Sequence, residues 1–185
     1  LRGLIHVGLR QQSAGRAGEF ASIDLSGALS DLGLTLGRLK TGTSPRLSRS
    51  TIDYARLTEQ WGDDEPWPFH WATERLALPQ VACHVTYTTP ATHDVVRANL
   101  DRSPLYSGVI DATGVRYCPS IEDKVVRFAD RERHQVILQP GGLCTAEVYA
   151  NGISTSLPVD AQEALVHSIP GLERAEIMRT TGVEI

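Results

Sequence analysis

Short apolar runs separated by polar, glycine-bearing or proline-bearing segments organise this chain. Alternation of apolar and polar positions predicts strands over residues 4–9, 81–88, 135–139, 146–149 and 175–179. Apolar positions three and four residues apart predict helices over residues 25–32, from 92 to about 100, from 120 to about 128, and over 159–168. The pattern therefore predicts a mixed α/β fold.

Residues that cap helices stand at the expected helix starts. Ser22 or Asp24 is the candidate cap of the first helix, and Thr92 is the candidate cap of the second. Ser120, with Asp123 three residues later, resembles a weak capping box and predicts a helix start there.

Three segments show neither the alternation of a strand nor the three-to-four spacing of a helix, and they are predicted to be loops. Residues 10–18 are polar and contain glycine, and residues 36–50 form a basic loop broken by Gly42 and Pro45. The basic loop contains no acidic residue, and its cations are Arg38, Lys40, Arg46 and Arg49. They could contact phosphates, or they could simply be solvated.

The third segment, residues 51–80, carries all three tryptophans of the chain, Trp61, Trp67 and Trp71. Indole rings can stack on nucleic-acid bases, but the acids that flank these rings would repel a phosphate backbone. A role in a lid or in the core is therefore expected for the tryptophans.

Composition narrows the class of protein. A chain of 185 residues with 41% hydrophobic and 22% charged side chains can bury the core of one domain or of two small ones. A net charge of −4 argues against a surface coated with basic charge. The chain begins without Met, shows no signal peptide or membrane-spanning run, and begins and ends in strand-like runs. We expect a soluble intracellular protein whose sequence is an internal piece of a larger fold.

The three cysteines, Cys83, Cys118 and Cys144, lie far apart and have no histidine at metal-ligand spacing. The spacing predicts free thiols rather than disulfides or a zinc site. Cys83 and Cys144 are expected to fill space. The general motifs of nucleotide binding and hydrolysis, including G-x-G-x-x-G, are absent from the sequence. Pattern alone therefore reveals no reaction.

Several strings resemble a known family in order along the chain. The longest is GVRYCPSIEDKVVRF at residues 114–128. Shorter ones are IHVGL at 5–9, GRAG at 15–18, GRLKTGT at 37–43, THDVV at 92–96, NLDRSP at 99–104 and NGISTSLP at 151–158. Together they resemble the glucose-inhibited division protein A (MnmG) family. Ser44 departs from the proline that the family more often carries.

The resemblance implies part of a glutathione-reductase-like FAD- and NAD-binding fold with an inserted α+β domain, without the first glycine-rich Rossmann half. Residues 1–50 would belong to the FAD-binding domain, and residues 51–185 would form the inserted nicotinamide and substrate-side domain that runs back into it. The implied activity installs an aminomethyl-type (carboxymethylaminomethyl) group at the 5-carbon of the wobble uridine of tRNA. It would use FAD, NADH and 5,10-methylenetetrahydrofolate.

The same resemblance implies tRNA as substrate, a GTPase partner of the MnmE type, a homodimer, no membrane contact, and the cytoplasm or else the mitochondrial matrix. Cys118 would be catalytic, because thiolate addition to the 6-carbon of uracil makes the 5-carbon nucleophilic. Arg116, Lys124 and the expected helix start would favour its thiolate, while Glu122 and Asp123 would oppose it. The alternative is a buried structural cysteine.

The resemblance assigns cofactor binding to a further set of residues. These are Arg16, Gly18, Ser22, Lys40, Gly42, Gly114, Arg116, Tyr117, Pro119, Ser120, Lys124 and Phe128. His93 would suit proton transfer, although a structural role is favoured. A non-catalytic RNA- or protein-binding module is the alternative to an enzyme, since the glycine-rich pyrophosphate loop is missing.

Overall fold

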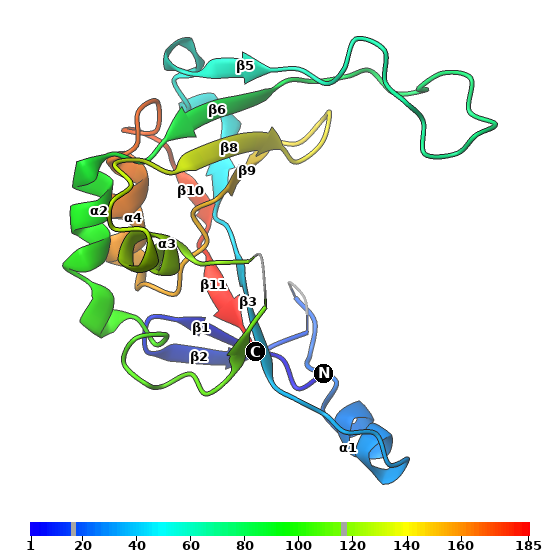
Figure 1. Ribbon diagram of the computed structural model, residues 1–185, viewed down its shortest axis with the longest axis vertical. Coiled ribbons are helices and arrows are strands. Elements are labelled where there is room, and N and C mark those ends of the chain that lie inside the picture. Colours follow the sequence, from blue (N-terminus) through cyan, green and yellow to red (C-terminus); the bar gives the residue numbers. More distant parts are fainter. Residues whose placement is uncertain (16–17, 116–117) are drawn as a thin grey trace.

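The computed structural model describes residues 1–15, 18–115 and 118–185, which form two sheets and four α-helices. The first sheet has the order β2-β1-β11-β3-β7, and the second has the order β10-β4-β9-β8-β6-β5. Figure 1 shows α2 (Pro90–Arg97), α3 (Ile121–Arg127) and α4 (Val159–His167) gathered beside the second sheet, while the first sheet and both chain ends lie below it. The prediction of a mixed α/β fold is confirmed.

The first sheet joins short strands from both ends of the chain. Its members are β1 (Leu4–Val7), β2 (Arg10–Ser13), β3 (Leu39–Thr43), β7 (Thr113–Gly114) and β11 (Gly182–Glu184). β11 pairs antiparallel with β1 and with β3, and β7 pairs parallel with β3. Residues near both ends of the chain therefore meet beside residues 39–43.

The second sheet carries the core. Its strands are β4 (Arg46–Ser48), β5 (Thr58–Gln60), β6 (Cys83–Tyr87), β8 (Gln135–Pro140), β9 (Glu147–Asn151) and β10 (Ile177–Arg179). The other elements are α1 (Ile23–Asp31), α2 (Pro90–Arg97), α3 (Ile121–Arg127), α4 (Val159–His167) and the 3₁₀ helices Arg49–Thr51, Tyr54–Arg56 and Leu100–Arg102. One buried cluster includes Leu47, Val96, Ile121, Leu138 and Leu165, and it joins α2, α3 and α4 to the sheet. Apolar burial of this kind is the main stabilising contribution to the fold.

Two segments pass between the sheets side by side. β3 leads through Ser44 and Pro45 into β4, and β10 leads through Thr181 into β11. The backbone N–H of Thr181 donates to Gln162 Oε1 over 2.9 Å, and its carbonyl accepts from Gln162 Nε2 over 3.0 Å. The Thr181 hydroxyl donates to the carbonyl of Thr43. The second passage is thus hydrogen-bonded both to α4 and to the first passage.

Two of the three predicted cap positions are confirmed, at Ser22 and Ser120, and the third, at Thr92, is wrong. α2 is capped by Thr89 rather than Thr92; the two residues form a reciprocal capping box, with the Thr92 N–H donating to Thr89 Oγ1. Ser22 is the N-cap residue of α1 but makes no side-chain cap hydrogen bond. Ser120 caps α3 as predicted, because its hydroxyl accepts from the Asp123 N–H over 3.2 Å.

The predicted loops at residues 10–18 and 36–50 contain strands. β2, β3 and β4 are polar or rich in glycine, so their sequences show little alternation. The backbone groups of β3 and β4 are paired by strands from distant parts of the chain, whereas β2 pairs with β1 across the two-residue turn at Gly8 and Leu9. In β3 and β4, long-range pairing thus overrode a weak local signal.

Residues 61–82 form an extended arm between β5 and β6, which Figure 1 shows reaching away from the second sheet. Trp67 and Trp71 are each 92% exposed, and Trp61 is 59% exposed. Of the expected roles in a lid or in the core, the core is therefore wrong, and the lid stays a prediction.

Gly171, which precedes β10, is predicted to be required for stability. Gly171 has a φ of +84°, and a Cβ there would lie 2.5 Å from Leu57 Cδ2. Gly171→Ala should lower the free energy of unfolding by about 1–3 kcal/mol, because it adds both backbone strain and a clash. Urea denaturation of this chain measures it.

Gly27→Ala is the matched control, because Gly27 lies in α1 and a Cβ there meets nothing within 4 Å. It should be neutral or stabilising by up to about 1 kcal/mol. Equal losses from both variants would contradict this account of Gly171.

Candidate functional site

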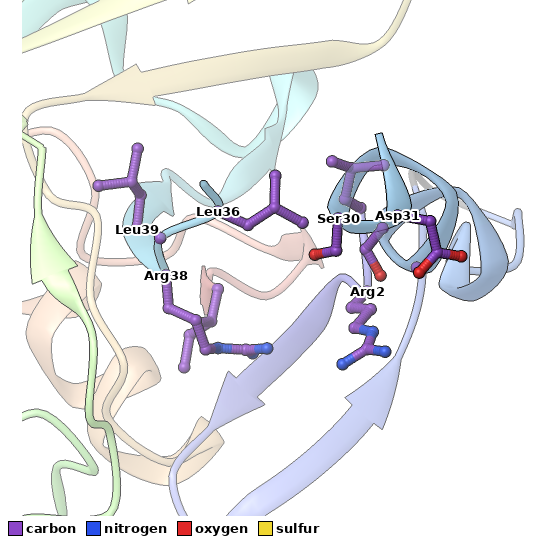
Figure 2. Close-up of a pocket in the computed structure, with 11 residues that line it drawn as sticks. Arg2, Ser30, Asp31, Leu36, Arg38 and Leu39 are labelled. Atoms are coloured by element: carbon purple, nitrogen blue, oxygen red, sulfur yellow. The ribbon is translucent and has the colours of Figure 1, made fainter. Parts of the chain in front are cut away.

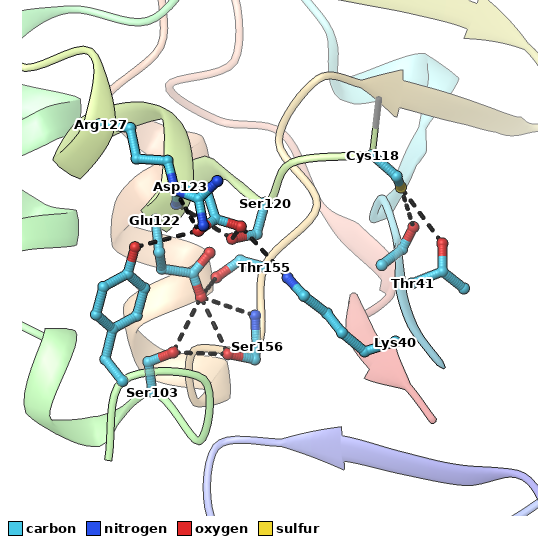
Figure 3. Close-up of polar contacts among 12 residues, drawn as sticks. Lys40, Thr41, Ser103, Cys118, Ser120, Glu122, Asp123, Arg127, Thr155 and Ser156 are labelled. Atoms are coloured by element: carbon cyan, nitrogen blue, oxygen red, sulfur yellow. Dashed lines mark hydrogen bonds and ion pairs between the residues drawn. The ribbon is translucent and has the colours of Figure 1, made fainter. Parts of the chain in front are cut away.

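Cys118 lies where the loop before α3 meets β3. Its Sγ is 3.3 Å from Thr41 Oγ1 and 3.9 Å from the carbonyl oxygen of Gly42 (Figure 3). The thiol is half-buried. Its contacts therefore come from β3, 76 and 77 residues away in sequence, rather than from the adjacent helix.

These surroundings favour the thiolate form of Cys118. The hydrogen bond with Thr41 is the largest cause that lowers the pKa of the thiol, and the main chain of Gly42 also lowers it. Burial raises that pKa, while the charges of Lys40 and Lys124 lower it further. A lowered thiol pKa is the condition for a nucleophilic cysteine at working pH.

Asp123 is the hub of the polar contacts beside the thiol. Its Oδ2 lies 3.3 Å from Lys40 Nζ, and its Oδ1 accepts from the Tyr106 hydroxyl over 3.3 Å. Arg127 Nε is 3.5 Å from the same Oδ1. Burial raises the pKa of the Asp123 carboxyl, but Lys40 and then Arg127 outweigh burial and lower it. Asp123 therefore stays charged. Its carboxylate interacts mainly with the Lys40 ammonium and is not among the groups that change the pKa of Cys118.

The carboxylate also acts on Tyr106. Burial and then the charge of Asp123 raise the pKa of Tyr106 to about 12. The phenol consequently remains a hydrogen-bond donor at neutral pH.

Lys124 is the second cation near the thiol. Its Nζ donates to the carbonyl of Gly152 over 2.8 Å. Burial lowers the pKa of Lys124, and the charge of Cys118 opposes that change. A thiolate and a partly buried ammonium thus stabilise each other's charged form.

The structure brings together the predicted residues of the 114–128 motif and of β3. Lys40 pairs in register with Gly114, and a Cβ at Gly114 would lie 3.2 Å from Lys40 Cε. Three more predicted residues are close by: Gly42 contacts the thiol, Ser120 caps α3, and Lys124 binds the carbonyl of Gly152. Pro119, between Cys118 and Ser120, is exposed.

Other predicted residues lie elsewhere. Phe128 is the C-cap of α3 and is 50% exposed. Ser22 is the N-cap residue of α1, and the exposed Gly18 precedes it; neither is among the hydrogen-bond partners described for the Cys118 thiol. Arg16, Arg116 and Tyr117 lie outside the described residues. The cofactor roles of the whole set stay predictions.

Two cations of the predicted basic loop have partners within the chain. Lys40 is paired with Asp123, and its side chain is only 12% exposed. Arg46 donates to the Ser44 carbonyl over 2.6 Å and lies 4.0 Å from the centre of the Tyr149 ring. A phosphate contact by either cation would have to compete with these partners.

Thr41 and Tyr106 were not among the predicted site residues. The signal for Thr41 was present, because it stands inside the string GRLKTGT at residues 37–43. Nothing in the sequence near Tyr106 indicated its bond to a carboxylate 17 residues later.

Two pockets lie where both chain ends meet β3. One, of about 550 Å³, is lined by Arg2, Asp31, Leu36 and Arg38 among others, and Figure 2 shows these side chains around it. The other, of about 310 Å³, is lined by both Ser22 and Thr41. The second pocket thus links a predicted cofactor residue to the hydrogen-bond partner of Cys118.

The other thiols and the histidines differ from Cys118. Cys83 is half-buried in β6, whereas Cys144 is exposed and does not fill space as expected. His93 is buried, with its Nε2 2.8 Å from Thr88 Oγ1 and its ring 5.2 Å from that of His134. These contacts fit the structural role favoured for His93. Within residues 1–15, 18–115 and 118–185, no group of three or more His, Cys, Asp or Glu side chains could hold a metal ion.

None of the helices in the described part of the chain has the length and apolar character needed to cross a bilayer.

The Thr41 contact can be tested by substitution. Thr41→Val keeps the shape of the side chain but removes the hydroxyl, so the pKa of Cys118 should rise. Alkylation of Cys118 by iodoacetamide at pH 7 should then slow several-fold, because the thiolate fraction falls as the pKa rises. The alkylation rate across pH, resolved by peptide mass spectrometry, measures both quantities.

Thr58→Val, an exposed change in β5, is the control and should leave the rate unaltered. A Thr41→Val variant that alkylates at the original rate would show that the hydroxyl does not set the acidity of Cys118.

Three comparisons place the chain among known proteins. The sequence model described as "Glucose inhibited division protein A" matches residues 1–185. The tRNA uridine 5-carboxymethylaminomethyl modification enzyme MnmG of Thermodesulfovibrio yellowstonii is 59% identical over 179 residues, covering 97% of this chain and 29% of that protein. The MnmG of Pelobacter propionicus is 56% identical over 185 residues, covering 100% of this chain and 30% of that protein.

A solved structure agrees with the sequence relatives. The structure of Aquifex aeolicus GidA in the form I crystal superposes with a TM-score of 0.86 at 46% identity, over 100% of this chain and 32% of that one. The chain spans less than a third of the length of each of these three relatives. Since the family match covers every residue, the chain belongs to the glucose-inhibited division protein A family.

Proposed function

We propose that this chain is the thiol-bearing part of a flavoenzyme that modifies the wobble uridine of tRNA. The observation that carries the proposal is the 3.3 Å contact of the half-buried Cys118 thiol with the Thr41 hydroxyl, which together with the charges of Lys40 and Lys124 favours the thiolate. The relatives that match the chain are named as enzymes of tRNA uridine 5-carboxymethylaminomethyl modification. The product would be a carboxymethylaminomethyl-type group at the 5-carbon.

The chemistry needs a soft nucleophile that is deprotonated near neutral pH. In the proposed step the Cys118 sulfur bonds to the 6-carbon of uracil, and the π electrons of the 5,6 double bond move toward the 4-oxygen. The 5-carbon then becomes nucleophilic. Thr41, Lys40 and Lys124 contribute by stabilising the thiolate before it attacks.

FAD, NADH and 5,10-methylenetetrahydrofolate are the proposed cofactors, with FAD carrying the redox chemistry. The pocket of about 310 Å³ beside Ser22 and Thr41 is in the size range of ligand sites and would suit one portion of a cofactor. The chain has no G-x-G-x-x-G turn to hold a pyrophosphate. The remaining part of an FAD site would thus have to come from other residues.

The proposed partners are tRNA, a GTPase of the MnmE type and a second copy of the enzyme. The proposed location is the cytoplasm, with the mitochondrial matrix as the alternative.

Replacement of the thiol tests the proposal directly. Cys118→Ser in the full-length enzyme should keep the fold and FAD binding but abolish modification of undermodified tRNA, because a serine hydroxyl stays protonated and adds poorly to uracil. The measurement is the product yield in tRNA digests.

Cys83→Ser and Cys144→Ser are the controls and should retain activity, with a loss of stability at most. Near-normal product from Cys118→Ser would remove this thiol from the mechanism and would favour the binding-module alternative.

The isolated chain should bind FAD poorly. Helix-start amides and a glycine turn normally hold the pyrophosphate of a dinucleotide, and this sequence lacks that motif. The flavin absorbance of the purified chain is the measurement. Stoichiometric yellow protein would contradict the expectation.

A further inference from the structure

Glu122 is buried among hydroxyl groups next to the site. Its side chain is fully buried, and its Oε1 accepts hydrogen bonds from Thr155 Oγ1 at 2.7 Å, the Ser156 N–H at 2.9 Å and Ser156 Oγ at 3.1 Å. Ser103 Oγ lies 3.3 Å from the same oxygen and 2.7 Å from Ser156 Oγ. Figure 3 shows these donors converging on one carboxylate oxygen.

The other carboxylate oxygen, Oε2, is buried and has no hydrogen-bond partner among residues 1–15, 18–115 and 118–185. Burying a carboxyl group is unfavourable unless its hydrogen bonds compensate. A residue kept here for stability alone could be apolar, as its helix neighbours Ile121 and Val125 are. The carboxyl group therefore calls for an explanation beyond packing.

The donors belong to segments that are remote from each other in sequence. Ser103 directly follows the 3₁₀ helix Leu100–Arg102, and Thr155 and Ser156 stand in the connection between β9 and α4. Glu122 itself is in the first turn of α3. One oxygen thus fixes α3 to the 154–156 segment.

The 154–156 segment in turn contacts the first sheet. The Thr155 N–H donates to Thr181 Oγ1 over 3.3 Å, and the Ser156 carbonyl accepts from the Gly8 N–H over 2.6 Å. A Cβ placed on Gly42 would lie 3.0 Å from Ser154 Cβ, so Ser154 packs directly on β3. Glu122 is therefore linked through this segment to the strand that carries Thr41.

The spacing between α3 and β3 determines the contacts of the site. Cys118 precedes α3 and Asp123 lies in it, while their respective partners Thr41 and Lys40 are on β3. Both the Cys118–Thr41 contact and the Asp123–Lys40 ion pair measure 3.3 Å. A small separation of the two elements would weaken both contacts.

We propose that Glu122 is a positioning residue whose buried carboxyl group, bonded to the 154–156 segment, holds α3 against β3 and thereby sets the reactivity of the Cys118 thiol. An effect of Glu122 on catalysis rests on the proposed function, in which Cys118 is the attacking thiol. The effect on the thiol itself does not depend on that role.

The experiment compares Glu122→Gln with Glu163→Gln in the full-length enzyme. Both changes replace a carboxyl group on a helix with an amide, but Glu163 is exposed on α4. The pH midpoint of iodoacetamide alkylation at Cys118, followed by peptide mass spectrometry, should rise in Glu122→Gln and stay unchanged in Glu163→Gln. The expected rise slows alkylation at pH 7 roughly tenfold.

A second pair of variants keeps the proposal testable if Glu122→Gln fails to fold. Thr155→Val removes the donor with the shortest bond to Glu122 and should raise the midpoint, whereas Thr155→Ser retains the hydroxyl and should restore it. An unchanged midpoint in folded Glu122→Gln, or in Thr155→Val, would overturn the proposal.

tRNA modification assays separate this inference from the proposed function. In Glu122→Gln the modification rate at saturating tRNA should fall and should recover as the pH is raised, because recovery follows the thiolate fraction. A shifted alkylation midpoint supports the positioning role even if Cys118→Ser retains full modification, which would refute only the catalytic role of the thiol.

Discussion

The buried amide of Gln162 satisfies a backbone that the sheets leave unpaired. At Thr181 the chain leaves β10 of the second sheet and enters β11 of the first, so ladder pairing is interrupted. Gln162 is 1% exposed and bonds both the N–H and the carbonyl of Thr181. Unpaired buried backbone groups are costly, so this one side chain from α4 makes the second passage between the sheets possible. Without that passage β11 would not lie between β1 and β3.

The contacts of Cys118 depend on this arrangement. β3 is held on one side by β11 and covered by Ser154, so the residues it presents to the loop before α3 have fixed positions. The two acids after Cys118 then take separate tasks. Asp123 faces Lys40 and Tyr106, whereas Glu122 turns inward to the hydroxyl cluster. Neither acid is among the groups that raise the pKa of Cys118, although sequence proximity alone suggested that both would oppose the thiolate.

The elements that could be predicted from sequence are those whose signals are local. The cap of α3 at Ser120 and the apolar face with Ile121 and Val125 follow from residues within one or two turns. β3 and β4 could not be predicted, because polar and glycine residues adopt extended structure there only after distant strands pair with them. The contact between Thr41 and Cys118 could not be predicted either. The two residues are 77 positions apart, and no pattern of neighbouring residues indicates that they meet.

The exposed arm at residues 61–82 has a practical consequence for spectroscopy. All three tryptophans of the chain stand on it, and two of them are 92% exposed. Indole emission reports the polarity around each ring, so the fluorescence of this chain describes the arm and is nearly blind to the packing of α2, α3 and α4 against the second sheet. A blue shift on mixing with another molecule would mean that the arm has become covered, whereas melting of the core must be followed by circular dichroism or by the absorbance of the tyrosines.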